Sequence, residues 1–146
     1  MGLALQEAQK ALEMGEVPVG AVIARGDAVI ASACNRRESD RDPTAHAEIL
    51  ALRAAGRVLG SRRLTGLTLY VTLEPCPMCA GAMVMAMLDG CYFAARDPRQ
   101  GCCESVYALP QEPCFSHRLP CVGGLREKEA QELLARFFAQ RRNEKE

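Results

Sequence analysis

Apolar residues recur along this chain with two different spacings, and these spacings divide it into helices and strands. Near the start, Leu5, Ala8 and Leu12 recur every three to four positions, which is typical of an amphipathic helix, and Gly15 follows where such a helix ends. The C-terminal stretch repeats this spacing with Ala130, Leu133, Leu134, Phe137 and Phe138. The two ends of the chain are therefore predicted to be helical.

Short runs rich in Val, Ile, Leu, Tyr and Thr predict strands between these helices. Two of the runs flank Arg25, Gly26 and Asp27, which is typical of a hairpin, while Thr44 and Pro77 are expected to cap and to start two further helices. The pattern predicts helices over 3–14, 44–58, 77–88 and 125–142, and strands over 17–23, 28–33, 67–73, 91–94 and 118–122. Residues 96–117 are rich in Pro, Gly and Cys, with one helical turn at 106–109. Helices between strands predict an α/β fold with helices on both faces of a sheet.

The length and composition are those of an ordinary globular protein with one domain, residues 1–146. Hydrophobic residues make up 49% of the chain and charged residues 25%. No apolar run reaches the ~20 residues of a membrane span, and residues 1–14 lack the pattern of a signal peptide. We therefore expect a cytoplasmic protein.

Two short motifs carry side chains that bind metals. Residues 46–48 read His-Ala-Glu, and residues 75–79 read Pro-Cys-Pro-Met-Cys. One imidazole and two thiolates, from His46, Cys76 and Cys79, are a ligand set for zinc that leaves the fourth position open for water, as in catalytic sites. His-x-Glu with a later Pro-Cys-x-x-Cys is the signature of zinc-dependent deaminases. The sequence thus predicts a hydrolytic zinc site.

Glu48 lies two positions after the histidine and is expected to handle protons rather than to bind the metal. Zinc lowers the pKa of water from about 16 to about 7, and a neighbouring carboxylate can carry the released proton to the substrate. A structural zinc site closed by a fourth ligand is the strongest alternative. Only His117 or another cysteine offers that ligand, and none has the spacing of a familiar site.

The remaining cysteines and the charge balance say less about function. Cys34 and Cys91 fall in strand-like runs and are expected in the core. The cysteines in the C-terminal third are Cys102, Cys103, Cys114 and Cys121. They could bind a second zinc ion, but we favour the interpretation that they are free thiols.

The 18 basic and 18 acidic residues cancel, so the chain lacks the strongly basic character of many nucleic-acid-binding domains. A local basic patch nevertheless suffices to bind a structured RNA loop.

Beyond these motifs, nearly the whole chain resembles the bacterial tRNA-specific adenosine deaminases. The resemblance is carried by residues 16–22 (EVPVGAV), 35–36 (NR), 42–48 (DPTAHAE), 72–82 (TLEPCPMCAGA), 95–98 (ARDP) and 137–142 (FFAQRR). Residues 42–48 are also similar to guanine deaminases, and the 95–98 segment and the C-terminal tail favour the tRNA enzymes. The chain departs from the family pattern at Cys102, Cys103 and Glu104, where small residues are usual.

The resemblance implies a three-layer α/β/α sandwich with a mixed five-stranded sheet, one catalytic Zn²⁺ per subunit and a homodimer. It implies hydrolysis of adenosine to inosine at the wobble position of a tRNA anticodon stem-loop. By the same resemblance His46, Cys76 and Cys79 are the zinc ligands and Glu48 is the proton shuttle. The implied substrate-binding residues are Asn35, Val19 and Ala47, and the implied RNA contacts are Arg96, Asp97, Arg141 and Arg142.

Two other functions are compatible with parts of the pattern. A zinc deaminase of a free base or nucleoside (guanine, cytosine or cytidine) would share the metal motifs and would not need the arginine-rich tail. A catalytically silent RNA-binding protein on the same fold would be expected to lack Glu48 or a ligand, and this chain retains all four residues. We therefore expect an enzyme.

Overall fold

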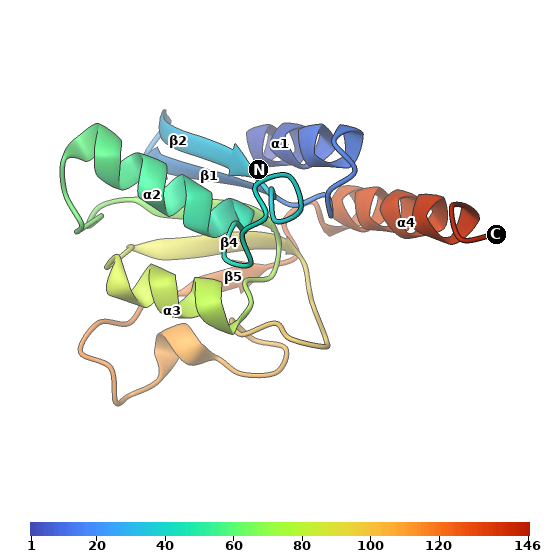
Figure 1. Cartoon of the computed structure of the whole chain (residues 1–146). Helices are drawn as coiled ribbons and strands as arrows, with labels where there is room; N and C mark the ends of the chain where they lie inside the picture. The colour runs from blue at the N-terminus through green and yellow to red at the C-terminus, as the bar shows by residue number, and fades with distance from the viewer.

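A mixed five-stranded sheet runs through the middle of the molecule, and helices cover both of its faces (Figure 1). The structure is a computed structural model that describes residues 1–146. Its strands are β1 (Gly20–Arg25), β2 (Ala28–Cys34), β3 (Thr68–Leu73), β4 (Gly90–Ala95) and β5 (Cys121–Gly123). They lie in the order β2-β1-β3-β4-β5, with β1 antiparallel to both neighbours and β3, β4 and β5 parallel.

The four helices form two layers around this sheet. The helices are α1 (Gly2–Glu13), α2 (Ala47–Leu59), α3 (Pro77–Met85) and α4 (Glu127–Asn143), and a short 3₁₀ helix, η1, spans Leu109–Gln111. Helices α2 and α3 pack together on one face, and α1 and α4 pack together on the other (Figure 1). The predicted three-layer fold with a mixed sheet is therefore confirmed. No helix has the length and apolar character needed to cross a membrane.

The main core lies between the sheet and the α2–α3 layer. Ile23, Leu69, Val71 and Phe93, from the three central strands, are inaccessible to solvent. On the opposite face α1 lies so close to β1 that a side chain at Gly20 would overlap it. A Cβ atom there would fall 2.0 Å from the carbonyl oxygen of Ala4. Glycine is thus required where the helix backbone meets the strand.

Three element boundaries differ from the sequence-based prediction in ways that bear on function. Helix α2 begins at Ala47, so the prediction that Thr44 caps it was wrong. The backbone N–H and the hydroxyl of Thr44 both donate to a carboxylate oxygen of Asp42, at 2.8 Å each. That turn occupies the threonine side chain, and His46 takes the N-cap position with an extended backbone.

The other two differences have equally local causes. Strand β1 begins at Gly20 rather than at residue 17, because Pro18 has no N–H to give to a ladder. Helix α3 ends at Met85 rather than at residue 88, because Met87 adopts a left-handed conformation with φ of 61°. The 3₁₀ turn also lies a few residues after the predicted helical turn.

Candidate active site and metal centre

The two metal motifs meet at one edge of the sheet. Strands β2, β3 and β4 end at this edge, and β1 begins there. The carboxyl ends of parallel strands are where open α/β sheets place ligands. Residues 74–76 follow β3 and lead into α3, while residues 35–46 follow β2 and lead into α2. The sheet therefore brings together motifs that lie thirty residues apart in the sequence.

His46, Cys76 and Cys79 form a compact group at the start of two helices. His46 is the N-cap of α2, Cys76 is the N-cap of α3, and Cys79 lies in the first turn of α3. The Nδ1 atom of His46 is 3.5 Å from Sγ of Cys76 and 3.4 Å from Sγ of Cys79. All three ligand atoms lie within 4.8 Å of one another. Both helix N-termini also favour thiolate over thiol.

These distances fit zinc. With Zn–S bonds of about 2.3 Å and Zn–N bonds of about 2.0–2.1 Å, a tetrahedral site places nitrogen and sulfur about 3.6 Å apart. The two N···S distances of 3.5 and 3.4 Å are close to that value. An imidazole and two thiolates are also a donor set that zinc prefers over magnesium or calcium. The three residues can therefore hold a zinc ion with little movement, and a fourth position remains for water.

Hydrogen bonds within the metal-free group determine where its protons lie. Hydrogen bonds from Cys79 and His46 lower the pKa of the Cys76 thiol to about 4. The hydrogen bond to Cys76, together with burial, raises the pKa of Cys79 above its ordinary value, so the shared proton stays on Cys79. The hydrogen bond to Cys76 likewise raises the pKa of His46. Because a metal ligand must be deprotonated, metal binding at neutral pH displaces these protons.

Glu48 lies in the first turn of α2, with only 4% of its surface exposed. It does not belong to the group of metal-ligating atoms. Burial raises the pKa of its carboxyl group above the ordinary value, which is the direction expected for a general acid or base. Glu48 nonetheless lines the same cavity as His46 and Cys76. It thus lies close to the metal-ligating residues, and its role in proton transfer stays a prediction.

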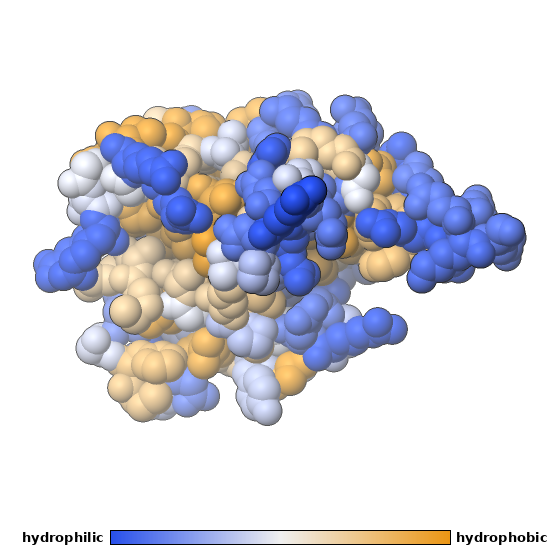
Figure 2. All heavy atoms as spheres, viewed as in Figure 1, coloured by the Kyte–Doolittle hydropathy of each residue, from blue (hydrophilic) through white to orange (hydrophobic).

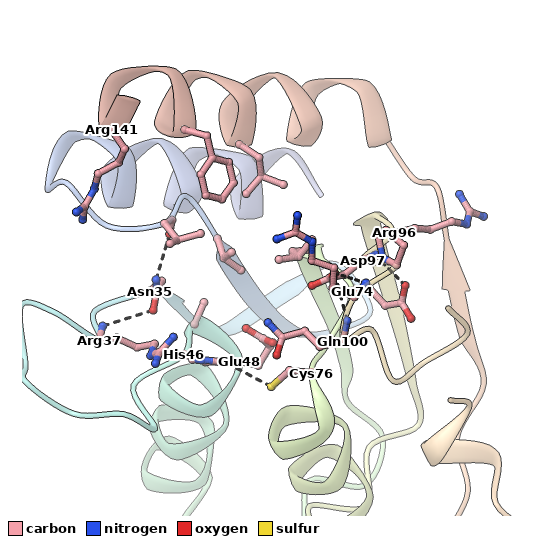
Figure 3. Close-up of a pocket in the computed structure, with 18 of the residues that line it drawn as sticks. Asn35, Arg37, His46, Glu48, Glu74, Cys76, Arg96, Asp97, Gln100 and Arg141 are labelled. Atoms are coloured by element: carbon pink, nitrogen blue, oxygen red, sulfur yellow. Dashed lines mark hydrogen bonds between the residues drawn. The ribbon is translucent and has the colours of Figure 1, made fainter. Parts of the chain in front are cut away.

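A cavity of about 750 Å³ opens over this group. Figure 3 shows His46, Glu48 and Cys76 on its α2 and α3 side, and Arg141 facing them from α4. Of the candidate residues predicted from the sequence, Cys79 alone does not line the cavity, because it is fully buried behind it. The ten that do are Val19, Asn35, His46, Ala47, Glu48, Cys76, Arg96, Asp97, Arg141 and Arg142.

The cavity floor holds an amide in a fixed orientation. Asn35 is 6% exposed, and its Nδ2 donates to the carbonyl oxygen of Val17 at 3.2 Å. Its Oδ1 accepts the backbone N–H of Arg37 at 3.4 Å. Val19 and Ala47 are buried beside it and supply apolar surface. An amide held next to apolar walls is suited to recognising the edge of a flat heterocycle.

The rim of the cavity is basic even though the whole chain has no net charge. Its cationic side chains are Arg37, Arg96, Arg99, Arg141, Arg142 and Lys145. Arg96 differs from the others because it forms ion pairs with Glu104 and Glu127, at 2.8 Å for the latter. Asp97 uses its carboxylate within its own loop, where it accepts the backbone N–H of Arg99 at 3.0 Å. The cationic side chains of the rim that form no ion pair are therefore those of residues 37, 99, 141, 142 and 145.

Several residues that line the cavity were not predicted from the sequence. Phe138 was assigned by periodicity to the buried face of α4, but it is 51% exposed and lines the cavity, while Phe137 is buried. Gln100 and Arg99 lie in a loop without periodic signal. Glu74 falls within a recognised motif, yet nothing nearby in the sequence indicates that it is buried at the cavity wall. Its contacts come from residues 97–105.

None of the six other cysteines lines the cavity. Cys34 and Cys91 are buried, and all eight thiols are free. The Nε2 atom of His117 lies 2.7 Å from the carbonyl oxygen of Leu88, which it can reach as a donor. His46, Cys76 and Cys79 are the group whose ligand atoms converge closely enough to hold a metal.

Comparison with known proteins agrees with this geometry. Residues 1–95 match the family model of the cytidine and deoxycytidylate deaminase zinc-binding region. The chain is also 46% identical over 142 residues to the tRNA-specific adenosine deaminase of Bacillus subtilis (strain 168), an alignment that covers 97% of this chain and 88% of that protein. The chain belongs to the tRNA-specific adenosine deaminase family. Zinc is the cofactor of the deaminase region that it matches.

The solved structures that superpose on this chain are also deaminases. One, from a study of A-to-I editing by tRNA:A34 deaminases at the wobble position, superposes with a TM-score of 0.88 and 46% identity, over 92% of this chain and 97% of that one. A guanine deaminase from Nitrosomonas europaea gives a TM-score of 0.79 at 26% identity, over 94% and 82% of the two chains. The tRNA deaminase is thus more similar than the guanine deaminase in both sequence and structure.

Proposed function

We propose that this chain hydrolyses adenosine to inosine at the wobble position of a tRNA anticodon loop. The observation that carries the proposal is a hydrolytic zinc site at the bottom of a cavity whose rim is basic. Five cationic side chains at this opening form no ion pair, in a chain of zero net charge. A positive rim attracts phosphates, which supply much of the affinity for RNA. A free base would not need such a rim.

The depth of the site fits a base that has left its stack. An anticodon loop offers unpaired bases, so turning one of them into a pocket costs less than opening a duplex. Asn35 and the apolar surface of Val19 and Ala47 are positioned to contact such a base. Arg141 and Arg142 on α4 also line the cavity, where the flanking backbone would pass. Family membership supports the same substrate.

In the proposed reaction, protein side chains hold the base and move protons. His46, Cys76 and Cys79 would hold the zinc ion, which would supply hydroxide at neutral pH by lowering the pKa of bound water to about 7. The Glu48 carboxylate accepts the proton from the attacking water and passes it to the ring nitrogen next to C6. It then moves a proton from the new C6 hydroxyl group to the amino group, which leaves as ammonia while the C6 carbonyl group forms. The buried position of Glu48 favours the first of these transfers, because burial raises the pKa of its carboxyl group and makes the carboxylate a better proton acceptor.

A panel of substrates tests this proposal. Anticodon stem-loop RNA with adenosine at the wobble position is incubated with the zinc-loaded protein, beside free adenosine, cytidine and guanine, and inosine and ammonia are measured. We expect inosine from the stem-loop and no turnover of the free compounds. Turnover of a free base or nucleoside with the RNA unchanged would mean that the zinc chemistry is assigned correctly and the substrate wrongly.

The homodimer implied by the resemblance also remains a proposal, and helix α3 supports it. The helix has no charged residue, and Met85 near its end is 78% exposed. Val106 and Tyr107, which precede η1, are also exposed, and η1 packs against α3. Figure 2 shows apolar surface over this region. A helix that is apolar all round is normally covered, and a second copy would cover it.

The oligomeric state can be measured directly. Light scattering coupled to gel filtration is expected to give twice the chain mass for the native protein and a single chain mass for Met85→Glu. A native protein that stays monomeric at high concentration would contradict the dimer and leave the catalytic proposal untouched.

A further inference from the structure

Glu74 is a second buried carboxylate at the cavity wall, and the reaction described above does not use it. It follows β3 directly, it is 2% exposed, and it lines the cavity. It is not one of the metal-ligating residues. A buried carboxylate without a cationic partner must be stabilised by hydrogen bonds. The groups that donate to Glu74 therefore identify the segment that this side chain holds in place.

All the donors to this carboxylate come from one loop, residues 97–105. One carboxylate oxygen, Oε1, accepts the backbone N–H of Asp97 at 3.1 Å and the hydroxyl of Ser105. The other, Oε2, accepts three successive backbone N–H groups, those of Cys103, Glu104 and Ser105, at 3.2, 2.9 and 2.8 Å. Successive N–H groups that converge in this way form an anion-binding nest. The loop is therefore folded around the side chain of Glu74.

The loop backbone packs directly against this carboxylate. A Cβ atom at Gly101 would lie 2.3 Å from the carboxyl carbon of Glu74. The loop is joined to the same strand end by a backbone bond from Cys102 to the carbonyl oxygen of Pro75, at 2.8 Å. Figure 3 shows Glu74 directly beside Asp97, with Gln100 next to them at the cavity.

The start of this loop forms a wall of the cavity. Residues 96–100 all line it, and none of them belongs to a helix or strand. The position of Arg99 and Gln100 at the rim therefore depends on the contacts of the loop rather than on regular secondary structure. Because the loop closes on one side chain, that side chain sets where this wall stands relative to the metal site.

We propose that Glu74 is a positioning residue that fixes the 97–105 loop as the wall against which the RNA substrate is aligned. The proposal rests on the proposed function for its substrate, whereas the anchoring itself does not depend on it. The side chain acts through its acceptor atoms. Glutamine at this position would place an NH₂ group against N–H donors, because only one of its two terminal atoms accepts hydrogen bonds.

The test compares Glu74→Gln with two other variants. Ser105→Ala removes one donor from an exposed position and is expected to fold. Asp89→Asn is the control, because Asp89 is also a carboxylate that accepts a backbone N–H, from Gly66 at 2.8 Å, but it lies outside the cavity. Zinc content, amide hydrogen exchange over 97–105, and KM and kcat for the stem-loop RNA are measured for each.

For Glu74→Gln we expect faster exchange over 97–105, unchanged zinc content, and a fall in kcat/KM of about 10- to 100-fold, most of it in KM. Ser105→Ala should give a smaller change in the same direction, and Asp89→Asn should give none. Unchanged exchange in both loop variants would overturn the anchor. Faster exchange with unchanged KM, or loss of zinc, would overturn the positioning role. A native protein that does not edit the RNA refutes the proposed function instead, and the exchange data then still decide whether Glu74 anchors the loop.

Discussion

Replacing Glu48 by glutamine separates proton transfer from metal binding more cleanly than any other change at this site. Glutamine has nearly the same size, so the 4% exposed position remains filled. The three ligand atoms are untouched, because Glu48 is not among them. The amide, however, cannot accept a proton from water and return it to the base. The structure thus predicts a protein that binds zinc normally and turns over poorly.

The size of the loss follows from the role assigned to the carboxylate. General acid–base catalysis contributes about 10²- to 10⁴-fold, which is about 3–5 kcal/mol of activation free energy at about 1.36 kcal/mol per tenfold. Single-turnover deamination of the anticodon stem-loop measures the chemical step, and atomic absorption measures zinc per chain. We expect the rate to fall by this factor with zinc content unchanged.

Glu16→Gln is the matched control, because Glu16 is also a buried carboxylate, 2% exposed, and it lies outside the cavity. It accepts the backbone N–H groups of Glu38 and Ser39. The control is expected to lose stability and to keep its turnover per bound zinc. A Glu48→Gln protein that retains near-native turnover would refute the proton-transfer role, and one that lacks zinc would show that Glu48 supports the metal.

The remaining predictions concern the metal, the fold and the RNA. Zinc titration at neutral pH should release protons, and zinc affinity should strengthen as the pH rises, because the raised pKa values of Cys79 and His46 favour their protonated forms without metal; a zinc affinity that does not change with pH would contradict this. Gly20→Ala should destabilise the fold by about 1–3 kcal/mol in urea unfolding, because its Cβ would meet the backbone of α1; an unchanged midpoint would mean that α1 shifts freely. Arg142→Ala should reduce the slope of log K against log salt for RNA binding by about 0.7; an unchanged slope would place Arg142 away from phosphates.

The metal centre could be predicted from the sequence because its residues form short motifs with characteristic spacings. His46 and Glu48 lie two positions apart, and Cys76 and Cys79 lie one helical turn apart, so the spacing itself specifies the shared face. Pro77 correctly predicted the start of α3, because proline is favoured in the first turn of a helix. The sheet could be predicted for a similar reason, since its central strands are runs of apolar residues.

The walls of the cavity could not be predicted in the same way. Thr44 has the side chain of a good helix cap, but Asp42 binds it first, and propensity does not reveal which of two local partners wins. The donors to Glu74 lie 23 to 31 residues further along the chain. Their convergence depends on how β4 pairs with β3, which is a tertiary contact. Phe138 is a similar case, since its spacing fits a core position while the cavity leaves it uncovered.

In the proposed reaction, this site adds water to an adenine base within an anticodon loop. The most direct measurement is to incubate the zinc-loaded protein with the stem-loop RNA in water labelled with heavy oxygen and to analyse the nucleosides by mass spectrometry. We expect inosine to arise from the wobble adenosine alone, with one heavy oxygen atom at C6, and no product to form after zinc is removed. Inosine without the label, or label in a free base while the RNA stays unmodified, would contradict it.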